Sequence, residues 1–282
     1  VALAKSVAVM TYNYKLRENS SDTSYYKYSK TPAFVSYDIC QDEPFANENV
    51  LGNCTGFLIG ENLLMTAGHC ISEQATCEYT SWIFDQIASN GLVKKSNTYQ
   101  CKKIIQTGIN ISKSNFYYQD YTIMQIEKKS SVLSRPYLKI SNEVLSEGNS
   151  LYTIGSPFGT PLKVANDAYI TSLLSSRESI IEAARQAGDE DLEYPLDRED
   201  YIMTNLDTFS GNSGSPVISE KTGHVIGVLS TGDTDWDFDD NNFCQRSRYK
   251  EMSGPGEEAV FKIQNIKNLD ELLKQDPSQS SF

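Results

Sequence analysis

Two short strings contain the residue types that acyl-transfer chemistry needs. The first, residues 66–70 (TAGHC), places His69 in a turn of small residues. The second, residues 211–216 (GNSGSP), places Ser213 between two glycines. A histidine can act as general base for a serine hydroxyl, which is a weak nucleophile until its proton is removed. Glycines permit a sharp bend whose free backbone N–H groups can bind a developing oxyanion.

A base of this kind needs a third group that holds its tautomer, and Asp120 is the best candidate. It heads the alternating segment 120–126 (DYTIMQI), where a strand could bury and fix the carboxylate. The other histidine, His224, lies in a predicted hairpin turn and receives no catalytic role. We therefore predict His69, Asp120 and Ser213 as the catalytic residues, with the N–H groups of Gly211 and Ser213 as the oxyanion hole. Taken alone, Asp120 could equally be an exposed aspartate at the head of a strand.

The six cysteines are even in number and include no CxxC pair, so they indicate disulfides rather than a metal site. With only two histidines as well, we predict no metal and no cofactor. Cys54 and Cys70 flank the segment that carries His69, and their bridge would close that loop. We add Cys77–Cys101 and Cys40–Cys244 as further pairs, with free buried thiols as the alternative. Disulfides favour an oxidising compartment, so we expect a secreted or periplasmic protein.

Composition narrows the possible partners. The formal net charge is −12 over 282 residues, which argues against nucleic-acid binding because phosphate contacts need a basic surface. The charge serves either solubility or the attraction of basic substrates. No apolar run approaches the ~18 residues of a membrane span. We expect a monomer whose partner is a protein or peptide substrate.

Short strand-like runs separated by turns predict an all-β barrel or sandwich. Two helices are also predicted. The first covers 176–187 and is followed by an acidic loop at 188–200. The second covers 266–273 and is followed by a frayed tail at 274–282. The break between two β halves is expected within 127–136. The predicted strands cover 6–10, 33–37, 55–59, 63–66, 121–126, 150–154, 215–218 and 224–230.

With its motifs around His69, Asp120 and Ser213, the chain resembles the trypsin/chymotrypsin-fold serine peptidases. The resemblance runs from about Ala33 to Leu273. It implies two six-stranded antiparallel β-barrels with the active site between them, a C-terminal helix, and here a helical insertion in the second half. Residues 1–130 would form the half carrying His69 and Asp120, and residues 131–282 the half carrying Ser213.

The chain differs from the animal trypsins at one position that bears on how the enzyme would be activated. Asn212 stands where those enzymes have an aspartate that pairs with a newly formed N-terminus, so we do not expect that route of activation. The string around Asn212 is more similar to the bacterial branch related to the glutamyl endopeptidases. Residues 155–159 (GSPFG) also resemble bacterial relatives.

The resemblance also implies a substrate pocket. Asp207 falls at its base with Thr208 beside it, and the wall that pairs with the substrate backbone would be Ser230, Thr231 and Gly232. Leu229 stands where glutamate-specific relatives carry a histidine, which argues against glutamate. Asp207 and the acidic run at 233–240 favour Lys or Arg before the scissile bond. Alternatively, Asp207 points away, because Phe209 replaces a cysteine that shapes the trypsin pocket.

The acidic run has alternating aspartates like a calcium loop but lacks the glycine and final glutamate of an EF-hand, so we predict a solvated loop. The expected function is a secreted serine endopeptidase that works through an acyl-enzyme. A catalytically silent binding or adhesion module on the same fold remains an alternative. So does a narrow processing peptidase or esterase with non-basic specificity.

Overall fold

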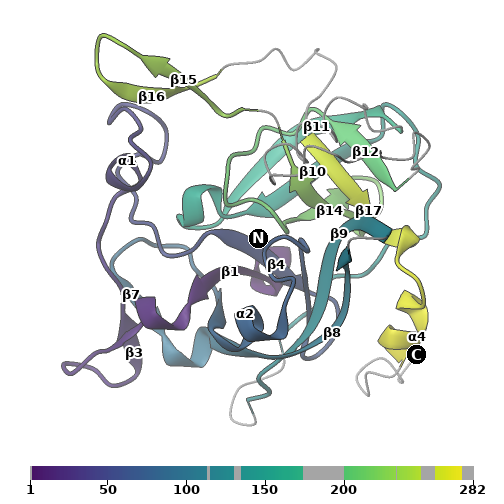
Figure 1. The fold of residues 1–282 in the computed structure, drawn as a ribbon, viewed down its shortest axis with the longest axis horizontal. Coiled ribbons are helices and arrows are strands. Elements are labelled where there is room, and N and C mark those ends of the chain that lie inside the picture. Colours follow the sequence, from purple (N-terminus) through teal and green to yellow (C-terminus); the bar gives the residue numbers. More distant parts are fainter. Residues whose placement is uncertain are drawn as a thin grey trace.

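A computed structural model describes residues 2–112, 115–129, 135–173, 200–232, 234–248 and 258–274. Within them, the chain folds into two closed six-stranded antiparallel β-barrels, which confirms the predicted fold class (Figure 1). The first barrel has the strand order β1-β4-β5-β9-β8-β6. Its strands are β1 (Val7–Tyr12), β4 (Cys54–Leu58), β5 (Leu63–Thr66), β6 (Thr80–Phe84), β8 (Thr98–Ser112) and β9 (Asn115–Ile126).

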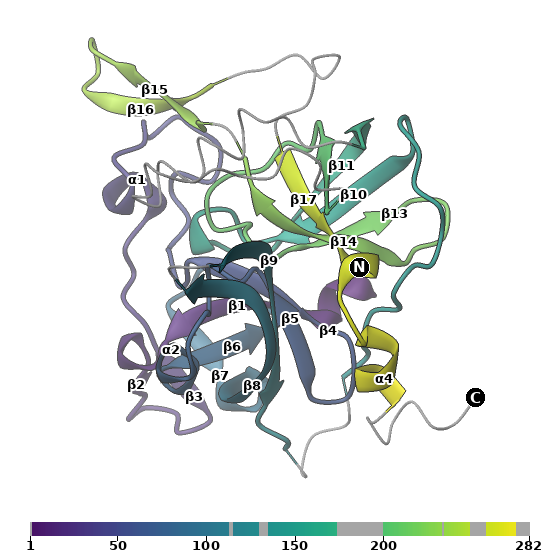
Figure 2. The same ribbon diagram turned by 45° about the vertical axis from the view of Figure 1, so that its right-hand side comes forward.

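The second barrel has the order β10-β11-β12-β17-β14-β13. A short C-terminal helix follows it and lies beside the first barrel (Figures 1 and 2), with Leu269 buried in a core cluster that draws on both barrels. The elements are β10 (Ser150–Gly155), β11 (Lys163–Ser172), β12 (Tyr201–Thr204), β13 (Pro216–Ser219), β14 (Val225–Thr231), β17 (Glu258–Lys262), η5 (Ile263–Asn265) and α4 (Leu269–Lys274).

Aromatic packing joins the two barrels close to Asp120. Tyr121 of β9 stacks on Phe261 of β17 with ring centroids 5.2 Å apart. Tyr201 of β12 meets the same Phe261 ring edge-on at 5.5 Å. These three side chains are buried, so the strand that carries Asp120 is fixed against the second barrel by apolar contacts.

Two small sheets and several short helices complete the described part of the chain. A three-stranded sheet flanks the first barrel, and a hairpin of β15 and β16 projects beside α1, away from both barrels (Figure 2). The remaining elements are η1 (Leu3–Ser6), η2 (Asn13–Lys15), β2 (Arg17–Glu18), β3 (Tyr25–Lys27), α1 (Ala33–Ser36), α2 (Gln74–Glu78), β7 (Leu92–Lys94), η3 (Lys95–Asn97), η4 (Pro157–Gly159), β15 (Trp236–Asp239) and β16 (Cys244–Ser247).

The predicted strand at 33–37 is wrong, because this segment forms the helix α1. Ala33, Phe34 and Tyr37 pack into one small apolar cluster, and their spacing places them on one face of a helical turn. Val35, which an alternating strand would bury together with Ala33, is exposed. The predicted helix at 176–187, residues 188–199 of the predicted acidic loop at 188–200 and residues 275–282 of the predicted tail at 274–282 lie outside the described residues.

The predicted solvated loop at 233–240 is also wrong at residues 236–239, which form strand β15. Two of its aspartates form ion pairs: Asp237 binds Arg248 at 2.6 Å and Asp239 binds Arg246 at 2.8 Å. Hydrogen bonds from Asn242 and Arg246 lower the pKa of Asp239 to about 2. Elsewhere, no helix in the described ranges has the length and apolar character to cross a bilayer.

Candidate active site

Two neighbouring strands of the first barrel bring His69 and Asp120 together. His69 sits in the loop that leaves β5, and β5 pairs with β9, which carries Asp120. The Asp120 carboxylate accepts the backbone N–H of His69 at 2.8 Å and lies 2.8 Å from its Nδ1. Asp120 is fully buried, whereas 38% of the His69 side chain is exposed. One carboxylate therefore fixes both the main chain and the ring of the histidine.

Opposing effects set the pKa values of this pair. Burial alone would lower the pKa of His69, but the charge of Asp120 and its hydrogen bond outweigh that effect and raise it. Burial alone would raise the pKa of Asp120, but the attraction to His69 and the hydrogen bonds from His69 and Ser230 lower it. Asp120 thus stays ionised at neutral pH and accepts the Nδ1 proton, so that Nε2 of the neutral ring carries no proton and can accept one.

Two residues of the second barrel complete the surroundings of Asp120. The Ser230 hydroxyl donates to its carboxylate at 2.5 Å, and the backbone N–H of Asp120 donates to the Tyr201 hydroxyl at 3.1 Å. Ser230 was predicted only as part of the pocket wall. Tyr201 was not predicted, and its only signal is that a tyrosine in a buried strand needs a partner for its hydroxyl.

Ser213 lies beside the loop that carries the histidine. Its carbonyl oxygen accepts the backbone N–H of Thr55 at 2.9 Å and lies 3.7 Å from Sγ of Cys70, the residue after His69. Its hydroxyl donates to the carbonyl of Ser230 at 3.4 Å. Ser230 therefore contacts Asp120 through its side chain and Ser213 through its main chain, which ties the two ends of the predicted site together.

The N–H groups of Gly211 and Ser213 donate to no residue that the structure describes. Gly211 has a φ of +97°, and a Cβ there would lie 2.6 Å from the carbonyl oxygen of Ser156. Only glycine fits this conformation and this space. The structure thus leaves both predicted oxyanion donors free beside the Ser213 hydroxyl.

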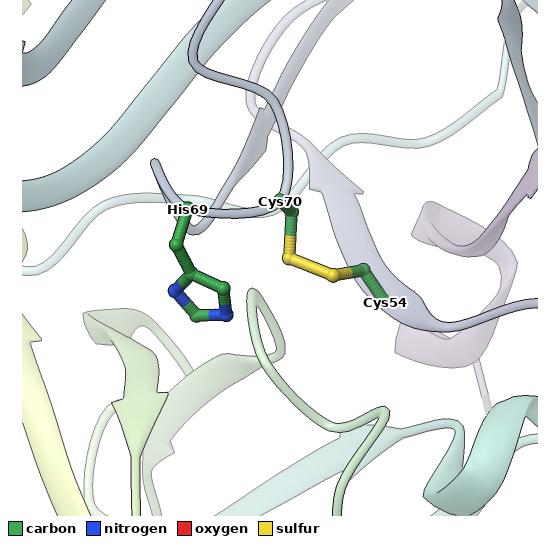
Figure 3. A group of neighbouring side chains, drawn as sticks. All are labelled: Cys54, His69 and Cys70. Carbon is green, nitrogen blue, oxygen red and sulfur yellow. A yellow bond between two sulfur atoms is a disulfide. The ribbon is translucent and has the colours of Figure 1, made fainter. Parts of the chain in front are cut away.

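Three disulfides join the six cysteines in the pairing that the sequence suggested: Cys54–Cys70, Cys77–Cys101 and Cys40–Cys244. The first lies beside His69 (Figure 3). The ring and the two sulfur atoms lie within 4.8 Å of one another, a spacing that could hold a metal ion. Sulfur atoms in a disulfide offer no thiolate, however, so this group lacks the ligands that such a site needs.

The predicted pocket residues lie in two segments. Asp207 is exposed and forms no ion pair with any part of the chain that is described, whereas the neighbouring Thr208 is buried. In the other segment, Gly232 follows Ser230 and Thr231 at the end of β14. A Cβ at Gly232 would lie 2.3 Å from a carboxylate oxygen of Glu258, the first residue of β17. The sequence analysis missed Glu258, because only the strand pairing brings it to this wall.

Comparisons with known proteins agree with the fold. The chain resembles the M. tuberculosis protease Rv3671c in an inactive form, with 14% identity over 96% of this chain and 90% of that one and a TM-score of 0.53. It also resembles neuropsin, a serine protease of mouse brain, with 18% identity over 79% and 88% and a TM-score of 0.50. Among curated protein sequences, none is similar enough to match. Residues 54–228, well over half of the chain, match the model of the trypsin-like peptidase domain. The chain therefore belongs to the trypsin-like peptidase domain family.

Proposed function

We propose that the protein is a secreted serine endopeptidase in which Ser213, His69 and Asp120 form the catalytic triad. The observation that carries the proposal is the ionised, buried Asp120 bound to both the main chain and Nδ1 of His69, with Ser213 held beside the same loop. The free N–H groups of Gly211 and Ser213 add the donors that a tetrahedral intermediate requires.

The mechanism follows from these contacts. The Ser213 hydroxyl leaves the carbonyl of Ser230 by rotation about its Cα–Cβ bond and attacks the peptide carbonyl, while Nε2 of His69 takes its proton. Asp120 stabilises the imidazolium, and the N–H groups of Gly211 and Ser213 bind the oxyanion. His69 then returns the proton to the leaving amine. A water molecule hydrolyses the acyl-enzyme by the same steps.

Labelling with a fluorophosphonate probe tests this proposal. The wild-type protein and a His224→Ala control are expected to label and to hydrolyse protein substrates. Ser213→Ala is expected to lose labelling and at least about 10³-fold in kcat. Hydrolysis that survives Ser213→Ala would overturn the assignment of the nucleophile. A folded wild-type protein that neither labels nor hydrolyses would instead be a catalytically silent binding module.

We also propose a preference for Lys or Arg before the scissile bond. Asp207 is exposed without an ion pair among the described residues, and the carboxylate of Glu258 lies against the wall at Gly232. A carboxylate at the base of the predicted pocket and another at its predicted wall would attract a cationic side chain. The neutral Asn212, whose amide donates to the carbonyl of Phe209 at 3.0 Å, supports a place near the bacterial glutamyl endopeptidase-like branch.

A peptide library that varies the residue before the scissile bond tests the preference. Asp207→Asn and Glu258→Gln are each expected to lower kcat/KM for Lys and Arg substrates about tenfold or more, and to change apolar substrates little. Glu220→Gln, at an exposed acidic residue elsewhere, is the matched control. Equal effects on basic and apolar substrates would contradict the preference and leave the peptidase assignment intact.

The three disulfides support a secreted or periplasmic location, because such bonds persist in oxidising compartments. Protein purified under non-reducing conditions from its native source is expected to contain no titratable thiol. Six reactive thiols in that material would contradict the location.

A further inference from the structure

We propose that the turn η4, Pro157–Gly159, is a positioning element that fixes the orientation of the peptide group between Ser210 and Gly211. This inference rests on the proposed function, in which the Gly211 N–H binds the oxyanion. Among the described residues, no hydrogen bond joins the turn to Ser213 or His69. It belongs to the GSPFG string, to which the sequence analysis gave no role.

One short hydrogen bond restrains this peptide group. The backbone N–H of Phe158 donates to the carbonyl oxygen of Ser210 at 2.6 Å. In a trans peptide the C=O and the following N–H point in opposite directions. The bond that holds the Ser210 carbonyl toward Phe158 therefore directs the Gly211 N–H away from η4, where it has no partner among the described residues.

The next two carbonyls of the loop are held as well. The carbonyl of Gly211 accepts the hydroxyl of Thr55 at 2.9 Å, and the carbonyl of Asn212 accepts the N–H of Ser215 at 2.9 Å. The second of these bonds directs the Ser213 N–H in the same indirect way. Both oxyanion donors are thus oriented through the carbonyl at the other end of their own peptide group.

The Ser210–Gly211 peptide needs such a restraint more than its neighbours do. Gly211 lacks the side chain that limits rotation of the backbone, and Ser210 is exposed. A reversed peptide would place a carbonyl oxygen, rather than an N–H, toward the developing negative charge. Loss of one oxyanion donor costs about 10²–10³ in kcat.

Phe158 is itself held in an unusual conformation. Its φ is +55°, which is uncommon for a residue with a side chain, and it is fully buried. Three aromatic rings surround its ring at centroid distances of 5.0–5.4 Å: Phe209, Trp236 and Tyr37. The Tyr37 hydroxyl also donates to the Phe158 carbonyl at 3.2 Å. Backbone strain that persists because its surroundings over-determine it is a mark of functional sites.

The test removes the ring and counts active molecules. In Phe158→Ala, the number of active sites is titrated with the fluorophosphonate probe, and kcat per titrated site and KM are then measured with a peptide ester. We expect kcat per site to fall about 10–100-fold with KM within twofold, because the lost donor acts only in the transition state. Phe158→Leu, which keeps a large apolar side chain, is expected to restore most of this loss.

Phe238→Ala is the matched control, because Phe238 lies on β15 with its side chain exposed, outside the cluster. It should leave kcat unchanged. If Phe158→Ala does not fold, Trp236→Ala and Trp236→Phe repeat the comparison at the half-buried ring that contacts Phe158. A fall in the number of active sites with unchanged kcat per site would show a merely structural role and overturn the inference. Failure of the wild type to label would instead reject the proposed function.

Discussion

The proposed base and the proposed oxyanion donors are held in place by different physical means. His69 is fixed by a buried charge, with two hydrogen bonds to Asp120 and a local disulfide across the neighbouring loop. The loop before Ser213 contains no buried charge of this kind. It is held by main-chain hydrogen bonds, by the Thr55 hydroxyl on the carbonyl of Gly211, by the partly exposed carboxylate of Asp235 on the N–H of Ser210, and by an aromatic cluster. The hairpin beside it is attached through Cys40–Cys244.

The contrast follows from the chemistry of each part. A histidine must sit in one tautomer beside an anion, so its support is electrostatic and needs burial. An oxyanion hole consists of backbone N–H groups, whose direction depends on the peptide plane and hence on packing around the loop. Changes near Asp120 should therefore alter protonation, whereas changes near Phe158 should alter geometry at constant protonation.

The largest effect is expected from Asp120→Asn. The amide can donate to Nδ1 of His69, which places the imidazole proton on Nε2 and prevents it from accepting the Ser213 proton. We expect kcat to fall about 10⁴-fold, the size found for the same change in another peptidase of this fold. Ser230→Ala, which removes one hydrogen bond and keeps the carboxylate, should lose no more than about tenfold. Equal losses of kcat in the two variants would contradict the view that the charge of Asp120 is the main support of His69.

The pH profile should separate the two regions more finely. The pKa of His69 is raised by Asp120, and only the neutral ring can act as base. As the pH falls below that pKa, kcat/KM is expected to drop about tenfold per pH unit. In Asp120→Asn, the midpoint of the pH profile of the residual kcat/KM should move to lower pH, because the charge of Asp120 is gone and burial alone then shifts the pKa of His69. A midpoint that stays or rises would contradict the electrostatic account, and the Phe158 variants should keep the wild-type midpoint.

The smallest effect on activity is expected from Glu43→Gln, far from the base. The Glu43 side chain is only 5% exposed and accepts hydrogen bonds from Arg246, at 3.1 Å, and from the Ser247 hydroxyl, at 2.6 Å. Its loss should lower the free energy of unfolding by about 1–3 kcal/mol and kcat by no more than a few-fold. Asp42→Asn, at an exposed partner of the same arginine, is the control and should change stability by less than about 1 kcal/mol. Urea denaturation measures both.

The sequence predicted the parts of the site that depend on local strings and missed those that depend on distant contacts. TAGHC and GNSGSP each carry their chemistry within six residues, so His69 and Ser213 could be proposed directly. Tyr201 and Thr55 act across 81 and 156 residues of chain, and no local pattern records such pairings. The density of short strands predicted an all-β barrel or sandwich, and the resemblance to the trypsin/chymotrypsin-fold peptidases supplied the two six-stranded barrels.

The errors have the same origin. The segment 33–37 alternates well enough for a strand, but the cluster with Phe158 makes a helical turn the better way to bury Phe34 and Tyr37. The acidic run at 233–240 suggested a solvated loop, yet Arg246 of β16 and Arg248, just after that strand, pair with two of its aspartates. In both cases the deciding partner lies outside the window that local sequence patterns cover.

The Cys40–Cys244 disulfide has a consequence for survival among other proteases. It joins two positions 204 residues apart, so most of the chain lies inside the covalent ring that it closes. A single backbone cut anywhere within that ring opens the ring without releasing a fragment. A nicked molecule would keep its nominal mass on a gel without reductant, and it would separate into pieces only after the disulfides are reduced.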